Sequence, residues 1–567
     1  MRRLNRVVPI ILLFWLPGLL IAQEVAAVRA QSRNIEKILG ISPAEPGKCG
    51  TSSIMLAFAR WPDLSANVRQ QVLVALQRPV LQKARPSPSG RFLIHYDTVG
   101  INAPALVAPG TGGRRISGTA ERFIDSVGSY FDRVWKLEID SLHYLAPPSD
   151  GMQGGGPEID IYVQELGTDM FGQTSWSPSG DLVEDGPRQR FSTYIEIDND
   201  FAGYRTPGMD GLAVTAAHEF FHAIQVGSYG VWSTVPNSDF YFYELSSVWM
   251  EHTAFGHVHD YYFYLPKYFQ FYRDGQDRSF AFTKFDGSYR GYERAIWALY
   301  LTKRFGNDVL KQVWAEMRQS TVLPSTSAVL QRLGTTTEQE FSLFSIWNYY
   351  TADRGDPVRY YDESRNYPRF KPNVSMDFFG SQAVIGSAAP PLSTQLYQFV
   401  MSNDTITAVV SNQDVAGAQA ATSGMGEVSL QMKSSGLEPP YQLIAPGIGI
   451  SFKTADAAKW KSTYLRSSSK SNAVIAPGPS PNPFRLSRDS RLILPVTGEG
   501  AQFADVYILS SAAEKVFARQ YEIRQSYGLT VVEVPAGDIR GDVATGVYFV
   551  VARRGEQEFK WKVAFIQ

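Results

Sequence analysis

The spacing of apolar and polar residues changes several times along the chain. Three short segments predict strands: "RFLIHYD" (91–97), and then "EIDIYVQEL" (158–166) and "RFSTYIEID" (190–198), which alternate apolar and polar positions. Between the first two, "GTAERFIDSVGSYFDRVWKLEIDSLHY" (118–144) repeats its apolar residues at helical spacing. We therefore expect a sheet with a long amphipathic helix between its strands.

Further helices and then more strands follow. Helical spacing recurs at 210–227, at 241–255 and across 290–351. From residue 375 onward, short apolar runs alternate with Gly, Ser, Pro and Asn, a pattern typical of β-sandwiches. The order of these segments predicts an α+β domain, with a mixed sheet and a helical subdomain, followed by all-β sandwich modules.

Breaker-rich stretches indicate where the domains begin and end. "RPSPSGR" closes an N-terminal extension or pro-segment at 23–88, and the α+β domain then covers 89–360. A sandwich-like accessory domain is expected at 375–470. The linker-like "SSSKSNAVIAPGPSPNPF" leads into an immunoglobulin-like domain at 473–567.

The N-terminus, residues 1–22, has the layout of a secretory signal peptide. Three arginines precede an apolar run at 7–21, and small residues allow cleavage after Ala22 or at Ala27. The alternative is an uncleaved membrane anchor, but the run is short and holds two prolines. No later segment is apolar for long enough to cross a membrane, so we expect no transmembrane span in the mature chain.

Composition narrows the function classes. The 567 residues carry a net charge of −1 and no long basic run after the first residues, which gives no support for nucleic-acid binding. Cys49 is the only cysteine, so an intramolecular disulfide is excluded even for an exported protein. Stability must come from core burial, aided by any bound metal.

One stretch, "AHEFFHAIQ", carries the clearest chemistry. On a helix, His218 and His222 share a face, about 5–6 Å apart at Cβ, so both imidazoles can bind one metal ion. Glu219 projects about 100° away around the helix and can act as a general base without binding the metal. Asp210 and Gly227 are the expected start and stop of this helix. The alternative is an ordinary packed helix that happens to carry two histidines.

A catalytic zinc site needs a third protein ligand and an open position. Glu244 lies beyond His222 with 21 residues between them, and Glu251 follows Glu244 by seven. Because seven helical residues separate the two carboxylates by about 10 Å, both cannot be equivalent ligands of one ion. We favour Glu244. Glu251 is then the alternative ligand, or a carboxylate that supports a ligand or faces the substrate.

His-Glu-x-x-His with a downstream glutamate resembles the gluzincin zinc metallopeptidases. "ELSSVWME" resembles the aminopeptidase-like pattern in which a second glutamate follows the ligand by seven residues, although Leu245 and Tyr241 replace the usual glycine and tryptophan. "KCGT", "GRFLIHYDT", "WMEH" and "RFGNDVLKQVW" are similar to segments of a family of secreted bacterial metalloproteases, over about 45–350. The resemblance implies a zincin-like fold for the α+β domain.

The resemblance also implies a reaction. One catalytic Zn²⁺ would polarise the scissile carbonyl of a protein or peptide substrate, while Glu219 takes a proton from water and passes it to the leaving amine. Tyr292, or alternatively Tyr289, is a candidate donor to the oxyanion. Three further histidines form a second cluster, expected at the surface or behind the ligands: His252, His257 and His259. A zinc ligand from that cluster would indicate another zincin branch, but its spacing from His222 does not fit the short metzincin pattern.

Cys49 lies ahead of the expected catalytic domain, in "GKCGTSS". Its thiolate could occupy the open zinc position in a precursor, an arrangement that loosely resembles the cysteine switch of the matrix metalloproteases. The alternative is that Cys49 is simply a small buried residue.

The end of the chain resembles the sorting domain of the type IX secretion system. "PSPNPF" matches its opening turn, and "GVYFVVARRG" and "KWKVAFIQ" match its last strands. The resemblance implies the secretion machinery as a partner, and export from a Gram-negative-type bacterium into the medium or onto the cell surface. The alternative is a plain immunoglobulin-like accessory domain.

Three functions remain open from the sequence. The first is a secreted zinc endopeptidase of gluzincin type. The second is an enzyme of the same architecture that trims N-termini, although the Gly-rich motif of the aminopeptidases is missing. The third is a surface adhesin or binding protein with an inactive zincin domain. The presence of both histidines, the candidate base and the candidate third ligand counts against this third function.

Overall fold

The computed structural model describes two compact units of the chain. The described residues are 31–40, 47–111, 113–167, 170–232, 239–270, 282–283, 291–377, 382–400, 405–412, 415, 426–433, 447–452, 463–466, 479, 482–496, 501–512, 514–526 and 529–567. The first unit takes in the chain up to Tyr268, with Thr283–Thr336 and Tyr361–Glu363; the second has Phe269–Phe282, Thr337–Tyr360 and Ser364–Gln567. The expected signal peptide at 1–22 lies outside the described residues.

The first unit is built on a five-stranded mixed sheet of order β1-β2-β5-β9-β6. Its strands are Lys83–Pro86 (β1), Phe92–Tyr96 (β2), Ile159–Gln164 (β5), Gly172–Ser175 (β6) and Tyr194–Asp198 (β9). Strands β2, β5 and β9 are parallel, whereas β1 and β6 run antiparallel at the two edges. Strands β5, β6 and β9 are buried along their whole length, as in sheets covered on both faces.

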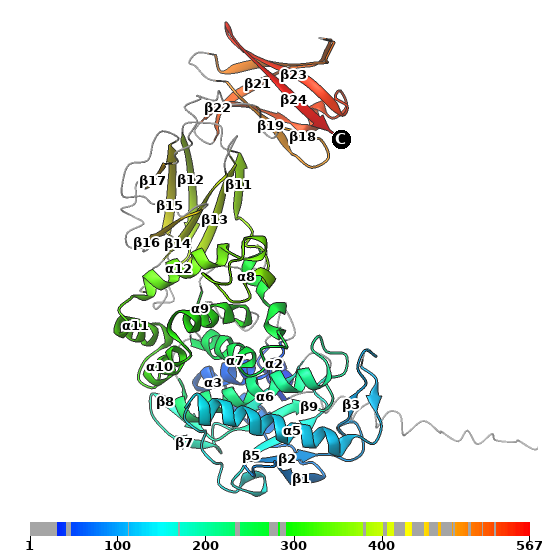
Figure 1. Ribbon diagram of the computed structural model, residues 1–567, viewed down its shortest axis with the longest axis vertical. Helices are drawn as coiled ribbons and strands as arrows, with labels where there is room; N and C mark the ends of the chain where they lie inside the picture. The colour runs from blue at the N-terminus through cyan, green and yellow to red at the C-terminus, as the bar shows by residue number, and fades with distance from the viewer. Residues whose placement is uncertain are drawn as a thin grey trace, which may run out of the picture. The chain divides into compact units, whose positions relative to one another are not determined.

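Three helices position the candidate site: Ala120–Trp135 (α5), Gly208–Ile224 (α6) and Phe240–Ala254 (α7). Helices α5 and α6 pack beside one another against the sheet, and α7 packs on α6 (Figure 1). The expected apolar stripe of α5 is buried, with Phe123 and Val127 fully covered. The long helix predicted between the first two strands is therefore confirmed.

The remaining elements of the first unit are short. The helices are Gln31–Ile38 (α2), Thr51–Ala59 (α3), Ala66–Ala75 (α4), Leu265–Phe269 (α8), Ala295–Phe305 (α9), Asp308–Glu316 (α10) and Val322–Arg332 (α11). The strands are Leu106–Val107 (β3), Arg115–Ile116 (β4), Leu182–Glu184 (β7), Arg188–Phe191 (β8) and Val231–Trp232 (β10). Helix α3 is buried from Thr51 to Phe58 and belongs to the core of this unit, whereas the largely exposed β1 joins its sheet by pairing with β2.

The segment "RFSTYIEID" differs from the single strand that its alternation predicts. It forms two strands in different sheets, β8 and β9. Between them, Ser192 donates its backbone N–H to the carbonyl of Asp181 at 2.8 Å, which continues the pairing of β8 with β7 and not that of β9. The alternation of apolar and polar residues cannot reveal such a break between strands.

The second unit contains helix Thr337–Tyr349 (α12) and strands to the C-terminus. One four-stranded sheet has the order β11-β13-β14-β16 and one three-stranded sheet has the order β12-β15-β17. Their strands are Val374–Asp377 (β11), Gln382–Ala389 (β12), Ser393–Val400 (β13), Thr405–Asn412 (β14), Gly426–Lys433 (β15), Gly447–Phe452 (β16) and Thr463–Arg466 (β17). Helix α12 lies against β14 and β16.

The last part of the chain forms a seven-stranded sheet that encloses its own apolar core, of order β18-β24-β23-β20-β21-β22-β19. Its elements are Phe484–Arg485 (β18), Arg491–Pro495 (β19), Phe503–Leu509 (β20), Lys515–Ser526 (β21), Leu529–Pro535 (β22), helix Ala536–Ile539 (α15), Gly546–Arg554 (β23) and Gln557–Ile566 (β24). Core side chains come from every strand, and strand β20 alternates buried and half-buried positions.

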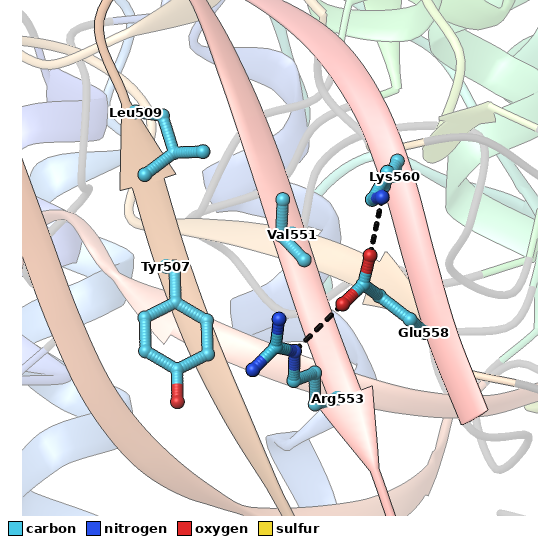
Figure 2. Close-up of a pocket in the computed structure, with 6 residues that line it drawn as sticks. All are labelled: Tyr507, Leu509, Val551, Arg553, Glu558 and Lys560. Carbon is cyan, nitrogen blue, oxygen red and sulfur yellow. Dashed lines mark hydrogen bonds and ion pairs between the residues drawn. The ribbon is translucent and has the colours of Figure 1, made fainter. Parts of the chain in front are cut away.

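The outer face of this sheet carries a shallow depression (Figure 2). It is lined by Tyr507, Leu509, Val551, Arg553, Glu558 and Lys560. Glu558 accepts a hydrogen bond from Arg553 Nε at 2.7 Å and pairs with Lys560. The first pair joins β23 to β24 and the second lies within β24; both are between exposed side chains and contribute little to stability.

The chain is thus a mixed α+β fold with several sheets, followed by β-structure to the C-terminus, as the sequence predicts. Within the residues described, none of the helices has the length and apolar character needed to cross a membrane.

Candidate metal centre

Helix α6 carries both histidines, but its ends differ from expectation. An extended residue precedes the first turn with no side-chain cap, and Asp210 lies within that turn. At the other end the chain continues through a π-helical turn, Gln225–Tyr229 (η4), and stops at Gly230, whose φ is 81°. Gly227 instead lies against Pro148, where a Cβ would come within 2.6 Å of the proline ring. The predicted cap and stop were therefore wrong, while the helix over both histidines is present.

Three ligand-type atoms converge between α6 and α7. His218 Nε2 lies 3.1 Å from His222 Nε2 and 3.3 Å from Glu244 Oε2, and His222 Nε2 lies 3.6 Å from the same oxygen. Ligands held at 2.0–2.1 Å from a tetrahedral zinc ion lie about 3.3 Å apart. Glu244 Oε2 is buried and has no hydrogen-bond partner among the described residues. The three atoms are therefore separated by distances that fit one shared metal ion. A metal ion would also give Glu244 Oε2 the bonding partner that it lacks.

The far side of each imidazole is held by another side chain. Glu251 Oε1 contacts His218 Nδ1 at 2.6 Å, and Gln225 Oε1 contacts His222 Nδ1 at 2.7 Å. The Gln225 amide is fixed in turn by the Tyr243 carbonyl and two serine hydroxyls on α7, at 3.1 to 3.2 Å. Partners of this kind set the tautomer, so that both Nε2 atoms can face a metal.

Glu219 lies beside this cluster without joining it. Its Oε2 accepts hydrogen bonds from Thr174 Oγ1 at 3.0 Å and Thr51 Oγ1 at 3.2 Å. Gly172 backs the carboxylate: a Cβ at this position would lie 2.9 Å from Glu219 Cγ. Strand β6 and the start of α3 thus fix the direction of the candidate base.

Cys49 enters the same cluster from the N-terminal segment. Its Sγ lies with ligand atoms of His218, His222 and Glu244, all within 4.8 Å of one another. The backbone beside it pairs with edge strand β6, where Gly50 N–H donates to the Gly172 carbonyl at 3.0 Å. Burial, aided by nearby carboxylates, raises the pKa of the Cys49 thiol well above its usual value.

Lys48 is a further residue beside the candidate site, and the sequence did not point to it. Its buried Nζ lies 2.6 Å from Glu251 Oε2 and 2.8 Å from Asp260 Oδ2. Burial disfavours the charged amine, but the two carboxylates outweigh that penalty and raise the pKa of Lys48. The only local hint was its position next to Cys49, because both carboxylates lie more than 200 residues away.

The cluster favours positive charge. Burial alone would lower the pKa of His218, but the neighbouring carboxylates of Glu244 and Glu251 raise it to about 9. Burial opposes the ionised form of Glu244, yet the two histidines hold its pKa well below the usual range. A divalent cation would take the place of the proton that these carboxylates attract.

The other predicted residues are placed as follows. Tyr292, in the 3-10 turn Tyr292–Arg294 (η7), accepts a hydrogen bond from the Cys49 N–H at 3.3 Å, and its ring centroid lies 6.3 Å from that of His218. The alternative Tyr289 lies outside the described residues. Ser52, not predicted, donates a short hydrogen bond to Glu244 Oε1. The second histidine group is not part of this cluster.

No family model matches this chain, and no curated protein matches its sequence. The chemistry of the cluster therefore rests on its own residues. Two imidazoles, a carboxylate with a free lone pair and a thiol are ligands suited to zinc and neighbouring transition metals. A fixed carboxylate beside them has the position of a general base.

Proposed function

We propose that this protein is a zinc-dependent metallopeptidase whose ligands are His218, His222 and Glu244. The supporting observation is the convergence of these three buried ligand atoms at 3.1 to 3.6 Å beside Glu219. The proposal includes a zincin-like α+β domain. Its sheet, with helix α6 packed against antiparallel edge strand β6, supports this.

Different side chains have separate roles in the proposed reaction. Zinc, when bound, would supply a Lewis acid for the carbonyl oxygen and would lower the pKa of a water. Glu219 takes the proton from that water and delivers it to the leaving amine, and Thr51 and Thr174 hold its Oε2 in place. Tyr292 is the candidate hydroxyl donor to the oxyanion.

Edge strand β6 is the element along which we propose that the substrate binds. An extended peptide can add to an exposed sheet edge through main-chain hydrogen bonds. The N-terminal segment does this in the form described here: the Lys48 carbonyl accepts from Phe171 N–H at 2.8 Å, next to the Gly50–Gly172 bond. This supports a protein or peptide substrate bound in extended form.

The position of Glu251 favours an endopeptidase over an enzyme that trims N-termini. An exopeptidase of the aminopeptidase type needs a carboxylate free to bind the substrate's α-amino group. Glu251 Oε1 is engaged with His218 and Oε2 with Lys48, both at 2.6 Å. Both oxygens are therefore occupied.

One observation favours a second candidate, a metal site without catalysis. Cys49 makes a fourth potential ligand, and all four residues are at most 1% exposed. Four protein ligands in a closed site are typical of structural zinc. We propose instead that Cys49 holds the catalytic position closed in this form, and that activity requires its removal.

The test uses the full chain, because residues 51–58 are buried in the core and β1 is paired into the sheet. Casein hydrolysis is compared for the wild type, Cys49→Ala, Glu219→Gln and the double variant, with zinc content measured for each. We expect Cys49→Ala to cleave, and the double variant to be at least about a hundredfold slower while retaining zinc. If Cys49→Ala binds zinc but is as slow as the double variant, the peptidase proposal fails. If the wild type matches Cys49→Ala, only the latency role of Cys49 fails.

We also propose that the protein is secreted or attached to the cell surface. The signal-peptide-like N-terminus and the resemblance of the C-terminal strands to a type IX sorting domain support this. Mass spectrometry of extracellular protein should show a chain that starts after residue 22 and lacks the C-terminal sheet. Mature extracellular protein that retains the last strands would argue against sorting with cleavage.

A further inference from the structure

A second group of ligand-type side chains lies at the C-terminal end of helix α7. His252 comes from the last turns of α7. His259 immediately precedes the 3-10 turn Asp260–Phe263 (η6), and Glu363 immediately precedes the turn Ser364–Asn366 (η9). One ligand atom from each of the three lies within 4.8 Å of the others. Residues 111 positions apart in the chain are thus brought to one point.

The distances within this group suit a shared ion better than direct hydrogen bonds. His259 Nδ1 lies 3.3 Å from Glu363 Oε1, and His252 Nε2 lies 3.8 Å from Glu363 Oε2. The buried Nδ1 atoms of His252 and His259 have no hydrogen-bond partner among the described residues. A buried ring nitrogen without a partner is costly, and a metal bond to His259 Nδ1 would remove that cost.

Aromatic side chains hold the three groups in position. The Tyr262 ring stacks on His259 with centroids 4.8 Å apart and planes 16° apart, and the Tyr261 ring meets His252 at 4.8 Å. The Tyr261 hydroxyl donates a short hydrogen bond to Glu363 Oε2. The imidazoles and the carboxylate are therefore oriented before any ligand arrives.

The group is separate from the candidate metal centre although it uses neighbouring residues. Glu251 and Asp260 point inward to Lys48, whereas His252 and His259 meet Glu363 near the surface. The three side chains are 22%, 35% and 22% exposed, so solvent reaches them. Coordination positions left over by three protein ligands could therefore be filled by water.

We propose that His252, His259 and Glu363 bind a second divalent metal ion of the zinc class. Two imidazoles and one carboxylate are a ligand set that zinc accepts, and they disfavour calcium and magnesium, which prefer oxygen ligands alone. The ion ties the end of α7 and the start of η6 to residue 363. Because Asp260 follows His259 directly, this metal also braces the loop that holds Lys48.

The test counts zinc ions bound by the full chain after chelator treatment and zinc titration, by calorimetry and by metal analysis. Four proteins are compared: wild type, His252→Gln/His259→Asn, His218→Asn/His222→Asn, and His257→Asn. Asparagine suits position 259, where φ is 53°, because it tolerates the left-handed region. His257 is an exposed neighbouring histidine outside the group, so its variant is the matched control. Circular dichroism checks that each variant is folded, and His259→Asn alone replaces the double variant if that one does not fold.

We expect two zinc ions per wild-type chain, two for His257→Asn and one for each double variant, with zinc affinity at the second site lowered at least about a hundredfold. One zinc in the wild type that His252→Gln/His259→Asn retains would overturn the second site and leave the first. A single zinc that only His252→Gln/His259→Asn loses would support the second site and overturn the first. A loss in His257→Asn equal to that in the double variant would overturn the assignment to His252 and His259.

Discussion

At the scale of single residues, Glu244 and Glu251 show why spacing alone could not assign the third ligand. Both lie on α7, yet they meet opposite nitrogens of one imidazole: Glu244 faces Nε2 of His218 and Glu251 faces Nδ1. One carboxylate can share a metal with the histidine, and the other can only orient it. The sequence left this choice open because the direction of a side chain across a helix interface depends on the partner helix.

This geometry predicts different effects for two matched substitutions. Glu244→Gln removes a proposed ligand, so zinc affinity should fall at least about a hundredfold. Glu251→Gln removes a partner of a ligand, which typically costs ten- to a hundredfold in affinity or activity. Zinc competition titrations on both variants provide the measurement. A larger loss for Glu251→Gln would reverse the assignment of the third ligand.

Glu196, in the middle of β9, gives a pH-dependent prediction. Burial outweighs its hydrogen bonds from Gln173, Ser175 and Gln164 and raises its pKa from 4.5 to about 7. The folded state therefore holds this proton more tightly than the unfolded state, and stability falls as pH rises from 4.5 to about 7, by on the order of 3 kcal/mol. Above that range the loss is complete.

Thermal unfolding of the wild type and Glu196→Gln between pH 4.5 and 8 would measure this effect. The variant cannot ionise at this position, so its melting temperature should rise relative to the wild type across that window. If the two curves stay parallel, burial does not raise the pKa of Glu196 as described.

At the scale of elements, the site depends on how edge strand β6 meets helix α6. Gly172 sits where the two come closest: a Cβ there would lie 2.9 Å from Glu219 Cγ, from Thr215 Cγ2 and from the Glu196 carbonyl oxygen. Three such contacts at once leave no direction in which a methyl group could move away. The glycine is thus required by packing, since its φ is not in the left-handed region.

Gly172→Ala should therefore displace the candidate base while leaving the zinc ligands in place. We expect overpacking to cost about 1–3 kcal/mol of stability and hydrolysis to fall at least about tenfold. Zinc content and casein cleavage, both in the Cys49→Ala background, would separate the two effects. Gly180→Ala is the control, because a Cβ there would lie 3.6 Å from its nearest neighbour. Normal cleavage by Gly172→Ala would mean that Glu219 does not need this contact.

Elements were predictable from the sequence where the pattern is local. Helix α5, helix α6 over both histidines, and strands β2 and β5 follow from apolar spacing within the segment itself. Lys48 and Thr51 were not predictable as parts of the site, since their partners lie 168 to 212 residues away. The extension of α6 into a π turn was missed for a related reason. The sequence predicts Gly227 as the stop of the helix, but this glycine packs closely on Pro148, which is distant in the sequence.

At the scale of the whole molecule, the C-terminal sheet has a core of its own. Leu492, Val506 and Val550 are fully buried within it, and its core residues come only from 484–565. A sheet of seven strands with an enclosed apolar core is large enough to be stable alone.

Residues 479–567 expressed alone should therefore unfold in one cooperative thermal transition. The complementary deletion, which ends the chain before residue 479, should leave zinc content and casein hydrolysis of Cys49→Ala within about twofold, because both proposed metal sites lie in the first unit. Loss of zinc on deletion would show that the C-terminal sheet supports the first unit.

The N-terminal segment has a further consequence, which concerns time. Cys49, Thr51 and Ser52 bond to residues that follow them by 243, 168 and 192 positions. During synthesis, a ribosome that has finished α6 has released both histidines, but Glu244 and Tyr292 are still to come. Contacts between residues so far apart form late. In the proposed latent form, these late contacts assemble the metal centre and place Cys49 beside it in the same step, so the site would be closed as soon as it is complete.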